Sequence, residues 1–471
     1  MGIGRTSDRS GVGGARTAAR RAARSMVAVA AATATIAAGG ALAPGVAGAQ
    51  SAASSGAGAS SLEDSVRSGL GLIANGSAFN SDAPTLAPLS VGTAPLSAAS
   101  EAGGTASASV PLLMGATLAM SLVPVGSLAN SAQLAGLFFG PSALTNAAGS
   151  FTGGGYPAPV PDPSIDANKL IKREKGADNS PRNLEIWTVT SATMNREVEL
   201  EVYLPGDSSA HAPVLYLLEG VDTVMPTPFR DRTSIARRAR DENVVAIAPA
   251  GAPGANWAEW EKDDQRLGRN KWNTFLADEL PRILAAQTGE TPAVGDKLTL
   301  NGKYGAIGMS MGAGSALRLA TNNPGRFAAV GGVSGCYSTD DDLGYQTIRL
   351  NVETRGGNLD NMWGPRGSAA WRQNDVTANA AKLSGTHVFL SAATGAIGAE
   401  DARQYGNEPA VLFSGYILEA GARECTERLS RSLDAAGVEH ENFYMPTGIH
   451  NWTAFGPGME KAFDSVIPKL R

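Results

Sequence analysis

The pentapeptide Gly308-Met309-Ser310-Met311-Gly312 limits the folds open to this chain more than any other feature of its sequence. An apolar run, Tyr304 to Ile307, precedes it, and a run rich in small residues, Met311 to Thr321, follows it. A serine on a tight turn from a strand into a helix needs glycine on both sides, because the backbone comes close there. The pattern therefore predicts a nucleophilic Ser310. A Gly-rich turn with a buried structural serine is the alternative.

Strands and helices are predicted to alternate on both sides of this turn. Val214 to Leu218 and Val244 to Ala248 are continuous apolar runs, which are typical of parallel strands buried on both faces. Leu184 to Val189 and Val198 to Leu204 indicate an antiparallel pair at the edge of the sheet. Further strands are expected at 327–333, 388–390 and 443–445, and helices at 233–243, 272–286, 311–321 and 419–436. This alternation predicts an α/β-hydrolase fold with a mostly parallel central sheet flanked by helices.

The first 165 residues have a different composition. Several arginines precede an apolar, uncharged run from Met26 to Ala38, and Ala47-Gly48-Ala49 fits a small-x-small cleavage pattern. We expect residues 1–49 to be a signal peptide for secretion to the cell envelope. A membrane-anchoring helix is the alternative, although the run is short for a span. Residues 50–165, rich in Ala, Ser, Gly and Pro, are expected to be a largely disordered extension, with residues 166–471 as the catalytic domain.

Charge and cysteine content narrow the classes further. The net charge is only -5, so the chain has no strong basic field for binding nucleic acid. No repeat or heptad pattern favours assembly, and we expect a monomer. The two cysteines, Cys336 and Cys425, can pair outside the cytoplasm.

A serine nucleophile needs a base, and the histidines are few. In this fold the chain order is Ser, acid, His, which excludes His211 among the four histidines. His387 and His440 lie where strands are expected to begin. His450 lies in a turn after the last expected strand, where the base must be to reach the serine, so we predict His450 as the general base.

Spacing alone leaves the acid open. Glu400 and Asp401 follow the expected strand 388–390, which is where this fold generally places the acid. Glu419, at the start of the expected long helix, is a competitor, and Asp375 is a weaker one. The oxyanion is expected to bind the backbone N–H groups of Met311 and of Val221.

Four segments carry a resemblance: the elbow GMSMGAGSALRLA, the strand and loop LYLLEG, the segment NMWGPRGSAAWRQND (Asn361 to Asp375) and the IHNW turn. Together they resemble the antigen 85 mycolyltransferases and their relatives in mycolate-bearing actinobacteria, over residues 183 to 457. The MWGP segment is more specific than the elbow. The resemblance implies a serine acyltransferase that moves a mycoloyl group from trehalose monomycolate to a second trehalose monomycolate or to arabinogalactan. It implies no metal or diffusible cofactor.

The family motifs also imply roles for single residues. Ser310 matches the nucleophile, His450 the base, and Glu419, within YILEAGAR, the acid, in preference to Glu400 and Asp401. Val221 and Met311 match the oxyanion donors.

The substrate site is expected to include Glu219, Asp222 and Trp452. Glu219 and Trp452 match family residues at the sugar site. After Gly220 the family often has an arginine, whereas this chain has Val221-Asp222-Thr223, which leaves the acceptor open. The cysteines do not match the family's disulfide positions. A bridge between them would tether the helix that carries the acid to the sheet.

Other functions share some of these features. A secreted carboxylesterase or lipase would have the same triad, and a non-catalytic envelope-binding protein could keep the fold. Association with the mycolate outer membrane would suit either enzyme. Three tryptophans before the elbow, Trp257, Trp260 and Trp272, fit either stacking on sugar rings or packing in the core.

Overall fold

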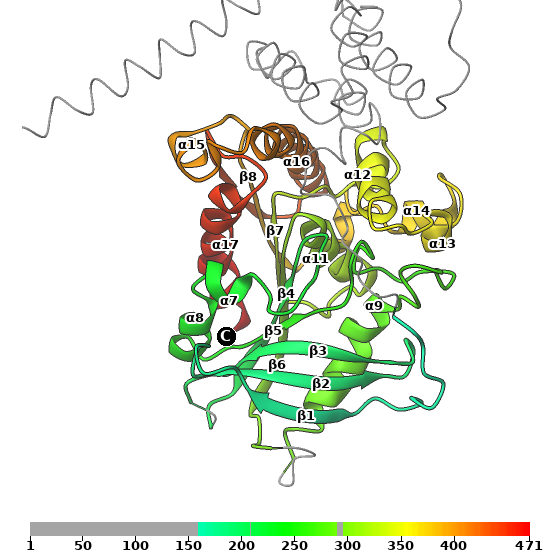
Figure 1. The fold of residues 1–471 in the computed structure, drawn as a ribbon, viewed down its shortest axis with the longest axis vertical. Helices are drawn as coiled ribbons and strands as arrows, with labels where there is room; N and C mark the ends of the chain where they lie inside the picture. The colour runs from blue at the N-terminus through cyan, green and yellow to red at the C-terminus, as the bar shows by residue number, and fades with distance from the viewer. Residues whose placement is uncertain (1–158, 208, 290–294) are drawn as a thin grey trace, which may run out of the picture. The chain divides into compact units, whose positions relative to one another are not determined.

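The computed structural model of the chain describes residues 159–471, apart from residue 208 and residues 290–294 (Figure 1). The expected signal peptide and most of the expected extension lie outside the described residues. Within them, a nine-stranded sheet has the order β1-β2-β3-β5-β4-β6-β7-β8-β9. The strands are β1 (Leu170–Lys175), β2 (Leu184–Ser191), β3 (Arg196–Tyr203), β4 (Ala212–Leu218), β5 (Val245–Pro249), β6 (Leu300–Met309), β7 (Ala329–Val333), β8 (His387–Ala392) and β9 (His440–Tyr444).

The sheet is mostly parallel, as the sequence predicts. Strands β5, β4, β6, β7, β8 and β9 run parallel to one another. Only β1, β2 and β3 pair in the antiparallel sense, with β3 joining β5. Every residue of β4, β5 and β7 is buried, because helices cover both faces of the parallel part. The α/β-hydrolase fold is confirmed.

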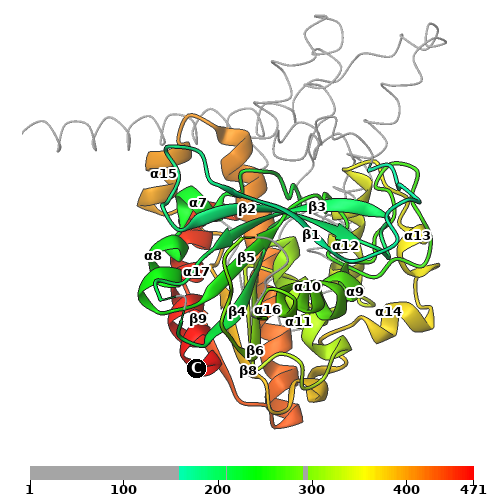
Figure 2. The ribbon, with the colours of Figure 1, turned by 90° about the horizontal axis from the view of Figure 1, so that it is seen from below.

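Helices cover the two faces of the sheet (Figures 1 and 2). On one face, α8 (Ile235–Asp241) and α17 (Trp452–Val466) pack against the strands through a large buried apolar cluster. On the other lie α10 (Leu280–Ala285), α11 (Met311–Asn322) and α16 (Pro409–Ala436). The remaining helices are α7 (Phe229–Arg232), α9 (Trp272–Thr274), η2 (Phe275–Glu279), α12 (Asp342–Glu353), α13 (Asp360–Trp363), α14 (Ala369–Gln373), η3 (Ala380–Leu383), α15 (Ala399–Tyr405) and η4 (Ile467–Leu470).

Three expectations need correction. The pair β2–β3 is antiparallel, but β1 forms the edge of the sheet; its sequence LIKREK is mostly charged and exposed, so it has no apolar signal. The long helix α16 begins at Pro409, and Glu419 lies in its interior instead of at its start. Strand β9 spans His440–Tyr444 instead of 443–445, because the first part of this edge strand is polar and gives no apolar signal.

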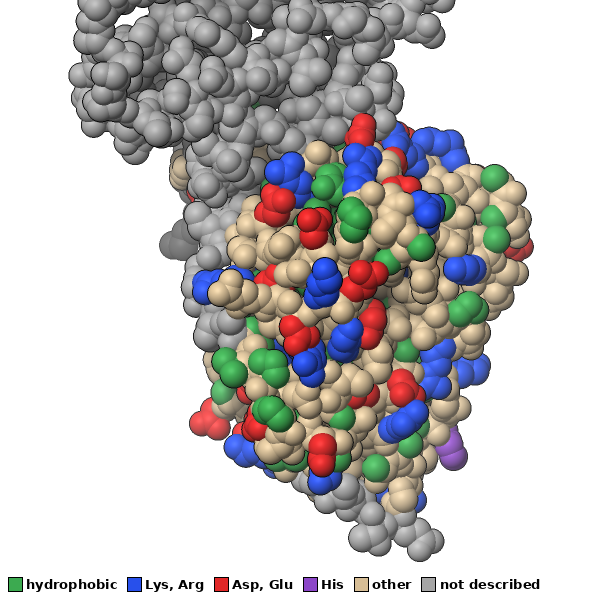
Figure 3. All heavy atoms as spheres, turned by 90° about the vertical axis from the view of Figure 1, so that its right-hand side faces the viewer, with side chains coloured by type: hydrophobic (Ala, Val, Ile, Leu, Met, Phe, Trp, Pro, Cys, Tyr) green, Lys and Arg blue, Asp and Glu red, His purple; other side chains and the backbone are tan. Residues whose placement is uncertain are grey.

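Two further features of the domain are the distribution of charge on its surface and the length and polarity of its helices. Figure 3 shows one face, on which acidic and basic side chains are interspersed, without a large area of one sign. In the part of the chain that the structure describes, no helix is both long and apolar enough to cross a membrane.

Candidate active site

Ser310 sits at the junction between β6 and α11 with a left-handed backbone, φ 53°. Such a conformation is strained for a non-glycine residue and is typical of a sharp turn that exposes a nucleophile. A Cβ at Gly308 would collide with the carbonyl of Gly312, and a Cβ at Gly312 would collide with the carbonyl of Leu218. Both glycines of the motif are therefore required by close backbone approach.

The structure brings together the three residues expected to form a triad. Ser310 Oγ lies 2.8 Å from His450 Nε2. His450 Nδ1 lies 2.8 Å from Glu419 Oε2. They come from the β6–α11 turn, the loop before α17 and the interior of α16, and the Glu419 side chain is fully buried. This arrangement lets the imidazole take the serine proton while the carboxylate fixes its tautomer.

Glu419 is held by two further donors that sequence reasoning did not identify. Its Oε1 accepts hydrogen bonds of 2.7 Å from the Ser334 hydroxyl and 2.7 Å from the Ala393 N–H. Ser334 is buried, follows β7 and has a left-handed backbone, φ 52°. A serine directly after an apolar strand is the only signal in the sequence, and it is too common to single out Ser334.

The other candidate acids have other partners. Glu400 is exposed and forms an ion pair with Arg403 on the same helix. Asp401 is buried and accepts from the backbone N–H groups of Gly398 and Ile449. Asp375 accepts from Ser338 and Thr339. The histidine ring thus meets Glu419, as the family resemblance implied and spacing could not decide.

The expected oxyanion donors flank the serine. Met311 is the first residue of α11, where the N–H has no acceptor within the helix. Val221 follows Gly220, whose Cβ, if present, would lie 3.4 Å from Ser310 Cβ and 3.7 Å from Oγ. The loop after β4 therefore runs beside Ser310, and the Val221 carbonyl anchors it by accepting from Gly254 N–H at 2.9 Å.

Two acidic residues lie on the same loop. Glu219 is only 6% exposed, and among the described residues its Oε2 has no hydrogen-bond partner. Burial, and then the charge of Asp222, raise the pKa of Glu219 to about 8, so its carboxyl is largely neutral near pH 7. Asp222 is partly exposed and pairs with the buried Arg355 at 2.5 Å. The Asp222 side chain is thus held by an ion pair directly after Val221.

The tryptophans have distinct positions. Trp452, two residues after His450, is partly exposed at the start of α17 and stacks edge-to-face on Phe455. Trp257, Trp260 and Trp272 are buried, and Trp257 packs edge-on against Trp272. Those three belong to the core and offer no face for a sugar ring.

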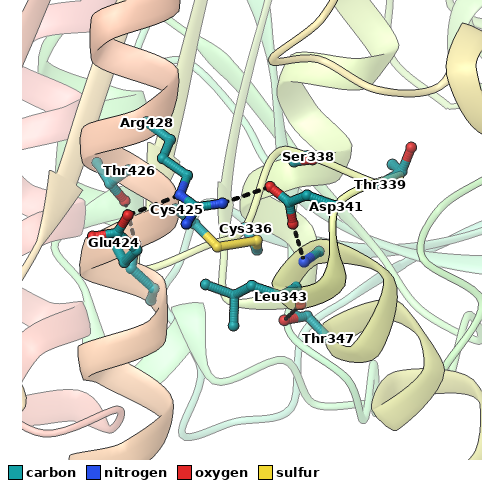
Figure 4. Close-up of a disulfide and its surroundings, with 12 residues drawn as sticks. Cys336, Ser338, Thr339, Asp341, Leu343, Thr347, Glu424, Cys425, Thr426 and Arg428 are labelled. Carbon is teal, nitrogen blue, oxygen red and sulfur yellow. Dashed lines mark hydrogen bonds and ion pairs between the residues drawn. A yellow bond between two sulfur atoms is a disulfide. The ribbon is translucent and has the colours of Figure 1, made fainter. Parts of the chain in front are cut away.

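Cys336 and Cys425 form a disulfide that joins the segment after β7 to α16 (Figure 4). Cys425 follows Glu419 on α16, and Cys336 follows Ser334, which binds Glu419. Figure 4 shows a second link beside it, in which Arg428 on α16 pairs with Asp341 at 2.8 Å. The acid helix is thus fastened to the end of β7. No group of His, Cys, Asp and Glu among the described residues could hold a metal ion.

The chain is similar to known esterases and mycolyltransferases. The family model described as "Putative esterase" matches residues 191–465. The diacylglycerol acyltransferase/mycolyltransferase Ag85A of Mycobacterium tuberculosis is 27% identical over 282 residues, which cover 58% of this chain and 77% of that protein. The Ag85B protein of Mycobacterium avium is 28% identical over 279 residues, covering 58% and 79%.

A solved structure of MPT51 from Mycobacterium tuberculosis aligns with 22% identity and a TM-score of 0.49, over 64% of this chain and all of that one. The family match spans both the Ser310 elbow and the His450 loop. The chain belongs to the putative esterase family and is an antigen 85-type enzyme of the acyltransferase and esterase class.

Proposed function

We propose that this protein is a secreted mycolyltransferase of the cell envelope. It takes a mycoloyl group from trehalose monomycolate and passes it to a second trehalose monomycolate or to cell-wall arabinan, through an ester on Ser310. The observation that carries the proposal is the unbroken chain of hydrogen bonds from Ser310 through His450 to Glu419, in an antigen 85-type chain. Residues 1–49 would direct export, and the product would join the mycolate outer membrane.

The first half of the reaction forms the acyl-enzyme. His450 Nε2 accepts the Ser310 proton as Oγ attacks the ester carbonyl carbon, and the N–H groups of Val221 and Met311 bind the oxyanion. When the intermediate collapses, the bond to the trehalose oxygen breaks, and that oxygen takes the proton from His450. Glu419 stabilises the imidazolium ion throughout.

The second half transfers the acyl group. A hydroxyl of the acceptor sugar gives its proton to His450 and attacks the acyl carbon, and Ser310 leaves with the proton restored. Water competes at far higher concentration, so transfer requires that the acceptor be positioned and water excluded. The neutral Glu219 carboxyl and the Asp222 carboxylate, beside the oxyanion loop, are suited to bind sugar hydroxyls.

A secreted carboxylesterase is the second candidate, because the matching family model is an esterase model. A purely binding role is the weakest candidate, because a binding protein does not need Ser310, His450 and Glu419 in contact.

The test incubates the protein with trehalose monomycolate and compares wild type with Ser310→Ala. Trehalose dimycolate that is absent with the variant supports the transferase. Free mycolic acid without dimycolate supports the esterase, and no Ser310-dependent product would contradict both.

A further inference from the structure

The catalytic histidine lies on a loop, residues 446–451, that has no regular structure of its own. A second loop, residues 394–398, runs alongside it. Gly395 N–H donates to the Gly448 carbonyl at 3.0 Å, and Gly448 N–H donates to the Ala396 carbonyl at 2.9 Å. The Thr394 hydroxyl donates to the Pro446 carbonyl at 2.7 Å. The histidine loop is thus paired with the segment that leads into α15.

Asp401, in the first turn of α15, reaches the residue immediately before His450. Its side chain is buried, with 1% exposed. One carboxylate oxygen accepts from Gly398 N–H at 2.7 Å and the other from Ile449 N–H at 3.3 Å. A single buried carboxylate therefore bridges the start of α15 and the histidine loop. Loss of this acceptor would leave the buried Ile449 N–H unsatisfied.

Tyr405 reaches the residue immediately after His450. It follows Asp401 by four positions, so both side chains lie on one face of α15. The Tyr405 hydroxyl donates to Asn451 Oδ1 at 2.9 Å. The same oxygen accepts from Trp452 N–H at 2.8 Å and caps α17. Tyr405 therefore fixes the cap at which the histidine loop becomes a helix.

The opposite side of the loop rests on α16. His450 N–H donates to the Gly415 carbonyl at 2.8 Å, one turn before Glu419 on the same helix. A Cβ at Gly415 would lie 3.0 Å from Ile449 Cβ, so the contact is close-packed. The backbone N–H of His450 and its ring Nδ1 thus both bind residues of α16, whereas α15 binds the residues on either side of His450.

We propose that Asp401 and Tyr405 are positioning residues, which set the orientation of His450 by holding Ile449 and Asn451 from one face of α15. Neither contacts the reacting atoms. The inference rests on the proposed function only in using Ser310 chemistry as its readout. Displacement of a catalytic group by about 1 Å can lower a rate by about 100-fold, so a small shift of this loop is measurable.

The experiment measures hydrolysis of p-nitrophenyl butyrate by the protein and its variants Tyr405→Phe and Asp401→Asn. Tyr405→Phe removes one hydroxyl, and Asp401→Asn keeps the shape of the side chain. Arg403→Ala is the matched control, because Arg403 lies on α15 but points to exposed Glu400. We expect kcat to fall about 5- to 50-fold in both variants with KM within about 2-fold, and the control to match wild type.

A purely structural role would also lower kcat, so the variants are repeated in a His450→Ala background. If Asp401 and Tyr405 act through His450, they cause no further loss of the residual rate there. Wild-type kcat in Tyr405→Phe, or an equal loss with and without His450, would overturn the proposal. If Asp401→Asn lowers Tm by more than about 10 °C, Tyr405→Phe decides alone.

The two proposals fail in different ways. Ester hydrolysis with these effects, but no transfer to trehalose monomycolate, removes the proposed function and keeps the positioning role. Transfer to trehalose monomycolate with wild-type kcat in Tyr405→Phe and Asp401→Asn keeps the proposed function and removes the positioning role. A wild-type protein that shows neither activity contradicts both.

Discussion

The carboxyl of Glu419 lies 2.8 Å from His450 Nδ1, and the partly exposed ring of the same histidine contacts Ser310 Oγ at 2.8 Å. Glu419 reaches the ring from the middle of a helix, whereas Glu400 and Asp401, which better suit the usual position of the acid in the chain, do not.

Glu419→Gln should nearly abolish turnover while the protein stays folded. The amide no longer stabilises the imidazolium ion and can favour the wrong tautomer, so we expect kcat to fall about 1,000- to 10,000-fold. Steady-state kinetics on an ester substrate checks this, with Glu400→Gln as the control on an exposed carboxylate. Equal losses in the two variants would contradict the assignment of the acid.

Ser334→Ala should lower both activity and stability. The variant removes one of the donors to Glu419 Oε1 and leaves the Ala393 N–H in place. A lost hydrogen bond to a buried charged group costs about 1.5–3 kcal/mol of unfolding free energy. We expect a smaller kcat as well, because the acid is less well oriented.

Urea unfolding and ester kinetics measure the two effects of Ser334→Ala. Ser338→Ala is the matched control, since its hydroxyl binds Asp375 instead. Loss of stability in Ser334→Ala with unchanged kcat would show that this contact does not orient Glu419.

Glu219 should make the protein less stable as the pH rises. Its pKa is about 8 in the folded protein, raised from 4.5 by burial. Between these values the folded state holds a proton that the unfolded state has released, so the free energy of unfolding falls from about pH 4.5 to about pH 8 and then levels off. The contribution is on the order of a few kcal/mol.

Urea denaturation between pH 5 and pH 9 tests this dependence. In Glu219→Gln, which cannot ionise at this position, the free energy of unfolding should fall less over this pH range, by the contribution given above. Identical slopes in the variant and the wild type would show that Glu219 does not titrate in this range.

Removal of the disulfide should destabilise the domain. Cys336 and Cys425 are 89 residues apart, and closing a loop of that length stabilises a protein by about 4–5 kcal/mol in the chain-entropy model. We expect a loss of this order in Cys336→Ala/Cys425→Ala, measured by urea unfolding. The Arg428–Asp341 ion pair should keep α16 near β7, so the double variant should still fold.

A thiol assay gives an independent check of the bridge. The native, non-reduced protein should contain no titratable thiol, and the reduced, unfolded protein should contain two. Two thiols in the native protein would contradict the disulfide.

Local sequence patterns predicted much of the fold. The buried strands β4 and β5 are continuous apolar runs, and the elbow motif requires glycine where the backbone comes close. Strands β1 and β9 were missed or misplaced because they lie at the edges of the sheet, where solvent contact removes the apolar signal.

The sequence by itself predicted Ser310 as the nucleophile and His450 as the base, because a local motif specifies Ser310 and the chain order leaves few histidines. Only the tertiary structure decided which carboxylate contacts His450, and how Ser334 and the disulfide hold Glu419 and its helix. It also decided how α15 binds the loop that carries His450. The physical reason is that these contacts join residues from separate elements of the sheet and its helices. Their proximity is set by packing and leaves no periodic trace along the chain.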